Sequence, residues 1–315
     1  VTLSEPNVLV LDMAEYSFDG QPWQSREEIL RIDNRLRTVA GYPLRTEAWP
    51  QPWTRKAEVP ASGSPKVELR YEIWSETEIR HVELGLEQPE QTLIFWNGEA
   101  AERKETGWYV DRRIRTVCLG ELRKGCNELR IVRDFHEKAN LEALYLLGDF
   151  GVRVRGRRAV VTEAVRELDF GDWTVQGLPF YGGNVTYDLK LETGSRQNPV
   201  TIQISNFTVP VIRVCLDGEK LGLIAFSPYC LTSDPLPAGR HDLAVTAYGN
   251  RVNTFGALHN VDADDNRSAP DYWRTTGCGW SYEYCLRPMG ILKTPVVTRR
   301  APEEEEASGQ VRTWE

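Results

Sequence analysis

The sequence lacks the features that define several common classes of protein. No apolar run approaches the roughly 20 residues that a membrane-spanning helix needs, so we expect no membrane partner. The formal net charge is −8, which leaves no basic excess to neutralise phosphates, and we expect no nucleic-acid partner. No G-x-S-x-G, P-loop or H-E-x-x-H motif is present. Serine-hydrolase and nucleotide-binding functions therefore have no support in the sequence.

Cysteine is scarce, and its spacing is uninformative for metals. The six cysteines contain no C-x-x-C pair, which argues against zinc and against a disulfide scaffold. We favour reduced thiols, because several stand among apolar residues of predicted strands, where Cys packs as a small buried hydrophobe. A Cys278–Cys285 or Cys215–Cys230 bridge is the alternative.

What the sequence does contain is a repeated β unit. An apolar run enters Asn97-Gly98 in one copy and Asp217-Gly218 in the other, and both dipeptides favour a two-residue hairpin turn. Gly125 and Gly239 each open a further alternating strand, and the strand over 67–73 aligns with that over 185–191. The 315 residues suffice for two domains, so we expect one β unit in each.

Helix signals are confined to one place near the start. Ser25 and Glu28 form a capping-box pattern before apolar residues spaced at three and four, which predicts a helix over 26–39 that ends at Gly41. The remaining pattern predicts short strands, including a returning strand over 280–286. The predicted strands of the first unit are 66–74, 79–87, 91–96, 113–118, 127–132 and 143–155.

These signals predict an all-β chain of two tandem antiparallel β-sandwiches of the jelly-roll type. A strand and helix linker is expected over 1–60, the first sandwich over 61–162 and the second over 163–298. A disordered acidic tail is expected over 299–315, because its charge run cannot bury a core. The chain begins with Val rather than Met, and we interpret it as part of a longer protein.

The repeated pattern resembles the sugar-binding, galactose-binding-like domains of family 2 and rhamnosidase-type bacterial glycoside hydrolases. The resemblance is carried by Trp96-Asn-Gly-Glu99, Lys124-Gly-Cys-Asn127, Asp217-Gly-Glu219 and Ala238-Gly-Arg-His-Asp242, and by the segment 248–259. It implies ancillary sandwiches that recognise an oligosaccharide or plant-type polysaccharide beside a catalytic domain of the same polypeptide. It also favours a secreted or cell-surface location. No position matches the catalytic part of that family, so no catalytic residue is assigned.

Two aromatic-rich segments supply the candidate carbohydrate site. Aromatic rings stack on the apolar face of a sugar, and a few polar side chains fix its hydroxyls. The candidates are Asp172, Trp173, Tyr181, Asn184, Asn253, His259, Trp273 and Trp280. The alternative is that these aromatics only cover the ends of the sandwiches, in which case the chain is a purely structural support for a catalytic barrel. A third alternative, that the chain is itself a glycosidase, needs two carboxyl groups at a defined separation.

No cofactor is expected apart from a weak calcium candidate. Asp262, Asp264 and Asp265 place hard oxygen donors at close spacing, which suits Ca²⁺. The run lacks the remaining ligands of an EF-hand loop, so a solvated acidic loop is the simpler interpretation.

Overall fold

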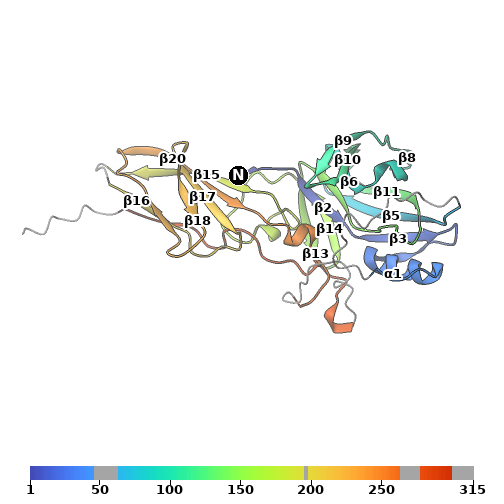
Figure 1. The fold of residues 1–315 in the computed structure, drawn as a ribbon. Coiled ribbons are helices and arrows are strands. Elements are labelled where there is room, and N and C mark those ends of the chain that lie inside the picture. The colour runs from blue at the N-terminus through green and yellow to red at the C-terminus, as the bar shows by residue number, and fades with distance from the viewer. Residues whose placement is uncertain (46–62, 195–197, 263–276, 300–315) are drawn as a thin grey trace, which may run out of the picture.

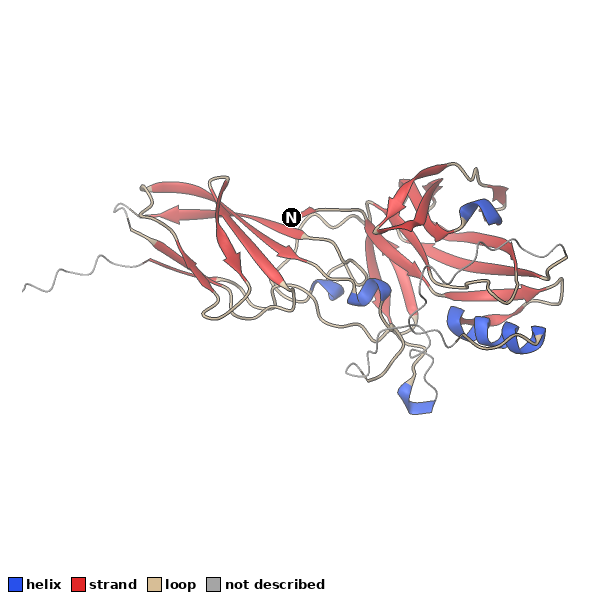
Figure 2. Cartoon of the chain, viewed as in Figure 1, coloured by secondary structure: helices blue, strands red, loops and turns tan. Residues whose placement is uncertain are grey.

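The computed structural model describes residues 1–45, 63–194, 198–262 and 277–299. Within these ranges the chain is built mainly of strands, arranged in two units that lie side by side with the N-terminus between them (Figure 1). Figure 2 shows that the helices are few and short beside the sheets. The predicted all-β class is therefore confirmed. No helix of the described residues is long and apolar enough to span a bilayer.

The first unit is a sandwich of two sheets that enclose one apolar core. One sheet has, in spatial order, β2 (Asn7–Leu11), β12 (Leu144–Gly148), β6 (Ile79–Glu87), β10 (Asp111–Leu122) and β9 (Glu105–Tyr109). The other has β13 (Gly151–Arg155), β14 (Arg158–Thr162), β5 (Lys66–Ser75), β11 (Gly125–Asp134), β7 (Thr92–Trp96) and β8 (Glu99–Ala100). β3 (Met13–Phe18) joins this sheet beside β5, and β4 (Gln24–Glu28) pairs with β3. The parallel contact between β14 and β5 departs from the otherwise antiparallel pairing of this unit.

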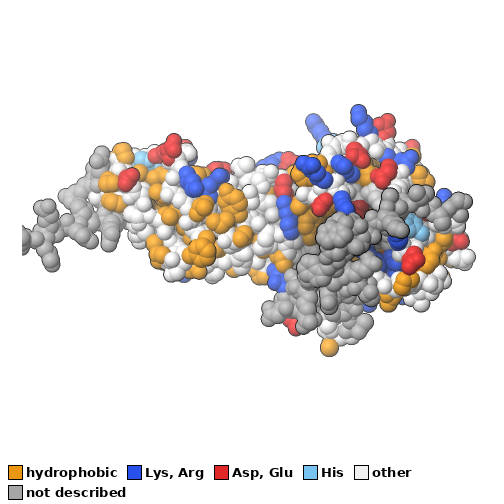
Figure 3. All heavy atoms as spheres, in the orientation of Figure 1, with side chains coloured by type: hydrophobic (Ala, Val, Ile, Leu, Met, Phe, Trp, Pro, Cys, Tyr) orange, Lys and Arg blue, Asp and Glu red, His pale blue; other side chains and the backbone are white. Residues whose placement is uncertain are grey.

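The second unit is smaller and has its own core. Its larger sheet has β1 (Thr2–Leu3), β15 (Val185–Thr193), β20 (Gly239–Tyr248), β17 (Val211–Leu216) and β18 (Glu219–Ile224). Its smaller sheet has β19 (Cys230–Thr232), β16 (Val200–Gln203) and β21 (Val296–Arg299). Figure 3 shows hydrophobic side chains over the visible face of this unit, while charged side chains gather over the first unit.

The sequence repeat corresponds to a repeated strand order. The first unit contains the series β5, β11, β7, β8, and the second contains the series β15, β20, β17, β18. Asn97-Gly98 and Asp217-Gly218 form the predicted hairpin turns, since Trp96 pairs with Glu99 and Leu216 with Glu219. All four turn residues have positive φ, between 50° and 87°, as a two-residue turn of this kind requires.

The segment expected to be a linker supplies strands to both units. β1 adds an edge strand to the second unit, whereas β2 and β3 pair with β12 and β5 of the first. β2 (Asn7–Leu11) is buried along its whole length. Residues 46–62 lie outside the described residues, as does the expected tail apart from Arg299 at the end of β21.

The predicted helix is present, but it begins later than expected. α1 (Ile29–Ala40) starts after Glu28, whose carboxylate accepts hydrogen bonds from the backbone N–H groups of Leu30 and Arg31. Ser25 lies instead in β4, so the predicted cap was wrong. The residues before Ile29 pair with β3, and this tertiary pairing prevails over the local capping signal. Gly41 ends the helix in the left-handed conformation, as predicted.

Two further expectations were wrong. Residues 280–286 form no strand; they run along the loop 256–261, where Ser281 N–H donates to His259 and Cys285 N–H donates to Leu258. The six cysteines are free, as we favoured, but none is buried, so the expectation that several pack as buried hydrophobes was wrong. Cys118 and Cys126 fall on the solvent side of β10 and β11, because alternate residues of a strand face opposite sides of its sheet.

Candidate functional site

The first predicted aromatic segment, 170–184, is packed rather than open. Trp173 is 0% exposed and Tyr181 is 1% exposed, so in this structure neither ring presents a face to solvent. The carboxylate of Asp172 accepts hydrogen bonds from Thr174 and from the backbone N–H of Met289. These contacts bind the segment to the core of the second unit.

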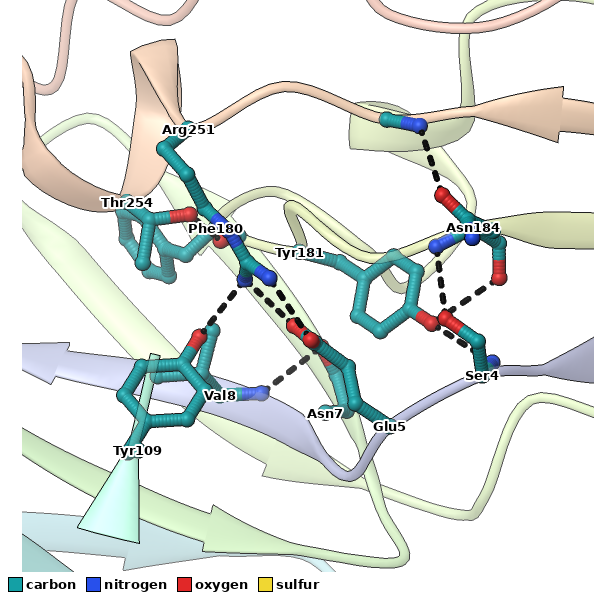
Figure 4. Close-up of polar contacts among 11 residues, drawn as sticks. Ser4, Glu5, Asn7, Val8, Tyr109, Phe180, Tyr181, Asn184, Arg251 and Thr254 are labelled. Carbon is teal, nitrogen blue, oxygen red and sulfur yellow. Dashed lines mark hydrogen bonds and ion pairs between the residues drawn. The ribbon is translucent and has the colours of Figure 1, made fainter. Parts of the chain in front are cut away.

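Tyr181 and Asn184 lie at the junction between the two units (Figure 4). The Tyr181 hydroxyl accepts a hydrogen bond from Ser4 N–H and donates one to the Asn184 carbonyl, each at 3.0 Å. Asn184 N–H donates to the Ser4 hydroxyl at 2.8 Å, and its side-chain oxygen accepts from Gly249 N–H. Both residues therefore join the N-terminal strand to the second unit.

A second part of the same junction is an ion pair between Arg251 and Glu5 (Figure 4). Arg251 makes two contacts with the Glu5 carboxylate, one of them at 2.6 Å, and a third with the Tyr109 hydroxyl at 3.3 Å. Glu5 follows β1, Tyr109 ends β9 of the first unit, and Arg251 follows β20 of the second. The bidentate contact therefore holds the connection from β1 of the second unit to β2 of the first, and the Tyr109 contact reaches the first unit directly.

Another predicted residue, Asn253, is buried in the short helix α2 (Val252–Phe255). Its side chain donates to the carbonyl of Arg287 at 2.8 Å and accepts from the N–H of the same residue at 3.0 Å. It also lines a small cavity of about 140 Å³ between α2 and residues 285–287. Asn253 thus holds the last segment of the chain against the second unit.

His259 and Asp12 form a buried ion pair that joins the loop after α2 to the first unit. The distance from His259 Nε2 to Asp12 Oδ2 is 3.1 Å, and each side chain is 6% exposed. The other carboxylate oxygen of Asp12 accepts from the Tyr284 hydroxyl at 2.8 Å, and His259 Nδ1 lies 2.8 Å from the Ser281 carbonyl. Although burial opposes it, the hydrogen bond to Asp12 raises the pKa of His259.

The carboxyl group of Glu28 is part of the same neighbourhood. Its pKa is raised to about 7; burial is the largest cause, and the nearby Asp12 charge acts in the same direction. The two backbone hydrogen bonds that cap α1, and the His259 charge, oppose this rise. Glu28 therefore changes protonation state near neutral pH.

These residues surround a cavity of about 420 Å³ between the first sandwich and the loop after α2, which we call the junction cavity. Its aromatic lining is Tyr145, Phe255 and Trp280. Its polar lining comprises Asp12, Glu28, Glu87, Asp111, Glu142, Thr254, His259 and Asn260. A cavity of this size that combines aromatic and polar side chains has the general form of a small-molecule site.

The rim of the junction cavity includes one strained residue. Val110 connects β9 to β10 with φ of +60°, in the left-handed region that a β-branched residue rarely adopts. Its side chain is 40% exposed and lines the cavity. Backbone strain of this kind is concentrated at functional sites.

The structure thus brings together only part of the predicted site. His259 and Trp280 line the junction cavity, whereas Asp172, Trp173, Tyr181 and Asn184 belong to the packing of the second unit and its junction. Trp280 also lies under the guanidinium of Arg31, 3.6 Å from the ring centroid. Trp273, Asp264 and Asp265 lie outside the described residues, and calcium binding stays a prediction.

Several residues of the cavity were missed by sequence reasoning. Asp12 and Glu28 come from the segment that we expected to be a linker. Tyr145 lies in the strand predicted over 143–155 and Phe255 in the segment 248–259, and neither was a site candidate. A usable signal was Asp12 itself, a carboxylate placed directly after five apolar or amide residues of a buried strand. A carboxylate at such a position needs a buried partner.

Neither a family model nor a curated protein matches the sequence. Among solved structures, the chain is similar to a rhamnosidase from Novosphingobium sp. PP1Y, with 16% identity and a TM-score of 0.27, over 75% of this chain and 23% of that one. It is also similar to a β-D-mannosidase from Dictyoglomus thermophilum, with 12% identity and a TM-score of 0.25, over 80% and 32% of the two chains. An anti-sigma factor domain-containing protein from Clostridium clariflavum has 8% identity and a TM-score of 0.20, over 76% and 90%.

The chain therefore spans about a quarter to a third of the two glycosidases that it matches. The similarity is weak. It defines neither a family nor an activity for this chain.

Proposed function

We propose that this chain is the non-catalytic, carbohydrate-recognising β-sandwich region of a larger glycoside hydrolase, and that the junction cavity holds the sugar. The observation that carries the proposal is the composition of this cavity, in which Tyr145, Phe255 and Trp280 stand beside carboxylates. Aromatic side chains bury the apolar side of a sugar ring, and carboxylates accept hydrogen bonds from its hydroxyls.

The hydrogen bonds of Asp12 and Glu28 make these two carboxylates poor candidates for catalysis. Both oxygens of Asp12 are occupied, by His259 and by Tyr284, and both oxygens of Glu28 accept backbone N–H groups of α1. A glycosidase needs one carboxyl to give a proton and another to attack or to activate water. Carboxylates that are already fully engaged in holding the fold are poorly suited to that chemistry.

The second candidate is a purely structural role, in which the two sandwiches support a catalytic domain. It is favoured by the burial of Trp173 and Tyr181 in the core of the second unit and of Phe180 in that of the first, because these aromatics do not form an open platform. The two candidates differ in whether the junction cavity takes a ligand.

The test is binding of oligosaccharides to the whole chain, followed by calorimetry or ligand-observed NMR. We expect Ala257→Phe, which places a ring inside the cavity, and Trp280→Ala, which removes part of its wall, to weaken binding at least tenfold. Trp74→Ala is the matched control, because this tryptophan is 52% exposed and does not line the cavity. If neither cavity variant changes the binding, the sugar binds outside the junction cavity. If no sugar of a broad panel binds, the structural role is favoured.

A further inference from the structure

The wall of the junction cavity has a one-sided charge. Five carboxylates line it, from Asp12, Glu28, Glu87, Asp111 and Glu142, and His259 is the one basic side chain among its described lining residues. His259 is already paired with Asp12. The remaining carboxylates therefore set the sign of the field inside the cavity.

Two of these carboxylates lie close together on the side of Tyr145. Glu87 and Glu142 are half-buried, and both also line a narrow extension of about 30 Å³ that runs beside Tyr145 toward Asn140. Burial, followed by the Glu142 charge, raises the pKa of Glu87. Two like charges in a partly desolvated place repel each other, so the charged form of this pair is already disfavoured.

The charges of Arg113 and Arg133 lower the pKa of Glu87, but less than burial and the other opposing causes raise it, so its pKa stays raised. Arg45 lies 3.7 Å from Glu142, at the long end of the ion-pair range, and its own side chain is 26% exposed. Arg133 lines the extension and not the main cavity, and its side chain donates to Gln88 and to the Asn140 carbonyl. Burial lowers the pKa of Arg133.

We infer that the junction cavity binds a neutral or amino-substituted pyranose that carries no carboxylate. Uronic acids are expected to be rejected. This inference rests on the proposed function, because it names the class of sugar for the same site. The hydroxyl groups of such a sugar can donate hydrogen bonds to the carboxylates of Glu87 and Glu142. An ammonium group of an amino sugar can do the same, and its positive charge is attracted to these carboxylates. A sugar carboxylate would add a further negative charge to a wall that already carries several carboxylates.

The experiment compares disaccharides that share ring configuration and linkage and differ only at C6. The probes are α-1,4-galactobiose against α-1,4-digalacturonate and cellobiose against cellobiouronic acid, with chitosan disaccharide as the amino sugar. Each is titrated into the whole chain at pH 7.5 and constant ionic strength. We expect the uncharged member of a bound pair to bind at least about tenfold more tightly than its uronate, as expected for one added like charge at close range.

The variants Glu87→Gln and Glu142→Gln test the cause. Each removes one charge while it keeps the shape of the side chain, and each is expected to narrow the ratio between neutral sugar and uronate about three- to tenfold. Glu99→Gln is the control, because Glu99 is exposed in the hairpin of β7 and β8 and lines no part of the cavity. The ratio should stay unchanged in this control.

The outcomes separate the inference from the proposed function. Uronates that bind as tightly as their neutral partners, in a manner that Ala257→Phe blocks, overturn the inference and leave the carbohydrate site in place. A preference for neutral sugars that neither Glu87→Gln nor Glu142→Gln changes also overturns the inference. The absence of binding by every probe overturns the proposed function and the inference with it.

Discussion

His241 of the second unit contacts Asp217 in the way that Asn127 of the first unit contacts Asn97. The His241 Nδ1 atom lies 2.6 Å from Asp217 Oδ2, and Asn97 Nδ2 donates to Asn127 Oδ1 at 3.0 Å. In both units the first residue of the turn also accepts a backbone N–H from the next strand, that of Asp242 or of Glu128. The repeat has therefore kept the geometry of the turn while it exchanged an amide pair for an ionisable pair.

We expect this exchange to make the second turn sensitive to pH and to leave the first insensitive. The hydrogen bond to Asp217 raises the pKa of His241, and the same bond lowers the pKa of Asp217. The contribution of His241 to stability is fully present at low pH and is lost as pH rises through the folded pKa of the imidazole. The contribution of Asp217 is present at higher pH and is lost as pH falls through the folded pKa of the carboxyl. The turn should be most stable between these two limits.

The double variant Asp217→Asn with His241→Asn tests this expectation, since it copies the amide pair of the first unit. Hydrogen exchange of the Asp242 amide, measured from pH 4 to pH 9 and corrected for intrinsic exchange, should show a maximum of protection in the wild type and a flat profile in the double variant. The Glu128 amide is the internal control. Identical profiles in both proteins would show that the ion pair does not contribute.

Much of the architecture was predictable because its signals are local. The alternation of apolar residues and the two turn dipeptides located β5, β6, β7 and β11 within one or two residues. The start of α1 was not predictable, because β4 pairs with β3 and the cap passes from Ser25 to Glu28. Nor did local signals show that residues 2–3 and 7–11 enter different units. Pairing between strands distant in sequence decides both the start of α1 and the unit that each segment joins. A local sequence pattern carries no information about such pairing.

We expect His259→Ala to destabilise the protein strongly. The substitution leaves the buried Asp12 carboxylate without its cation, and removal of one partner from a buried ion pair costs about 3–5 kcal/mol. Denaturation by urea at pH 7 measures this loss. His81→Ala is the matched control, because the side chain of His81 is 63% exposed, and it should change the free energy of unfolding by no more than about 0.5 kcal/mol. Equal effects of the two substitutions would show that the ion pair with Asp12 is energetically unimportant.

The burial of Glu28 predicts that stability falls as pH rises toward neutrality. Its pKa is about 7 in the folded protein against 4.5 for the free carboxyl, so the folded state binds more protons between these values. Stability is then lost as pH rises through this window, by up to about 3 kcal/mol. Glu28→Gln should flatten this part of the curve, at a cost of about 1 kcal/mol at pH 5 for the altered cap. Urea denaturation at pH 5, 6, 7 and 8 measures the slope, and the exposed Glu78→Gln should keep that of the wild type.

The candidate site was harder to predict than the fold, for a physical reason. Trp173 and Trp280 follow similar Gly-containing patterns, yet Trp173 fills the core of the second unit and Trp280 lines the junction cavity. The sequence shows that an aromatic side chain is present, but it does not show whether that side chain is buried in a core or lines a cavity. Asp12 and His259 are 247 residues apart, and only the packing of one unit against the other brings them together.

The burial of Trp173 predicts that its removal affects folding rather than ligand binding alone. Trp173→Ala would leave a large void in the core of the second unit, at a cost of about 3–5 kcal/mol. Thermal or chemical denaturation measures this cost. Trp74→Ala, at a position 52% exposed, should cost less than about 1 kcal/mol. A folded Trp173→Ala protein of unchanged stability that no longer bound sugar would instead support the original assignment of this residue to a carbohydrate site.

The contact between Arg251 and Glu5 predicts a specific weakening of the junction. Arg251→Ala removes two contacts with Glu5 and one with Tyr109, and these groups lie between the two units (Figure 4). We expect a loss of about 1–3 kcal/mol, because the pair is only partly buried and Glu5 regains water when its partner is removed. Hydrogen exchange should show faster opening of β1 and β2 at the junction, while exchange in β11 and β20 stays slow. Arg166→Ala is the control, because its pair with Asp149 is about two-thirds exposed and should contribute little to stability. If the two substitutions had equal effects on β1 and β2, the coupling of the units would have to come from the buried pair of His259 and Asp12 instead.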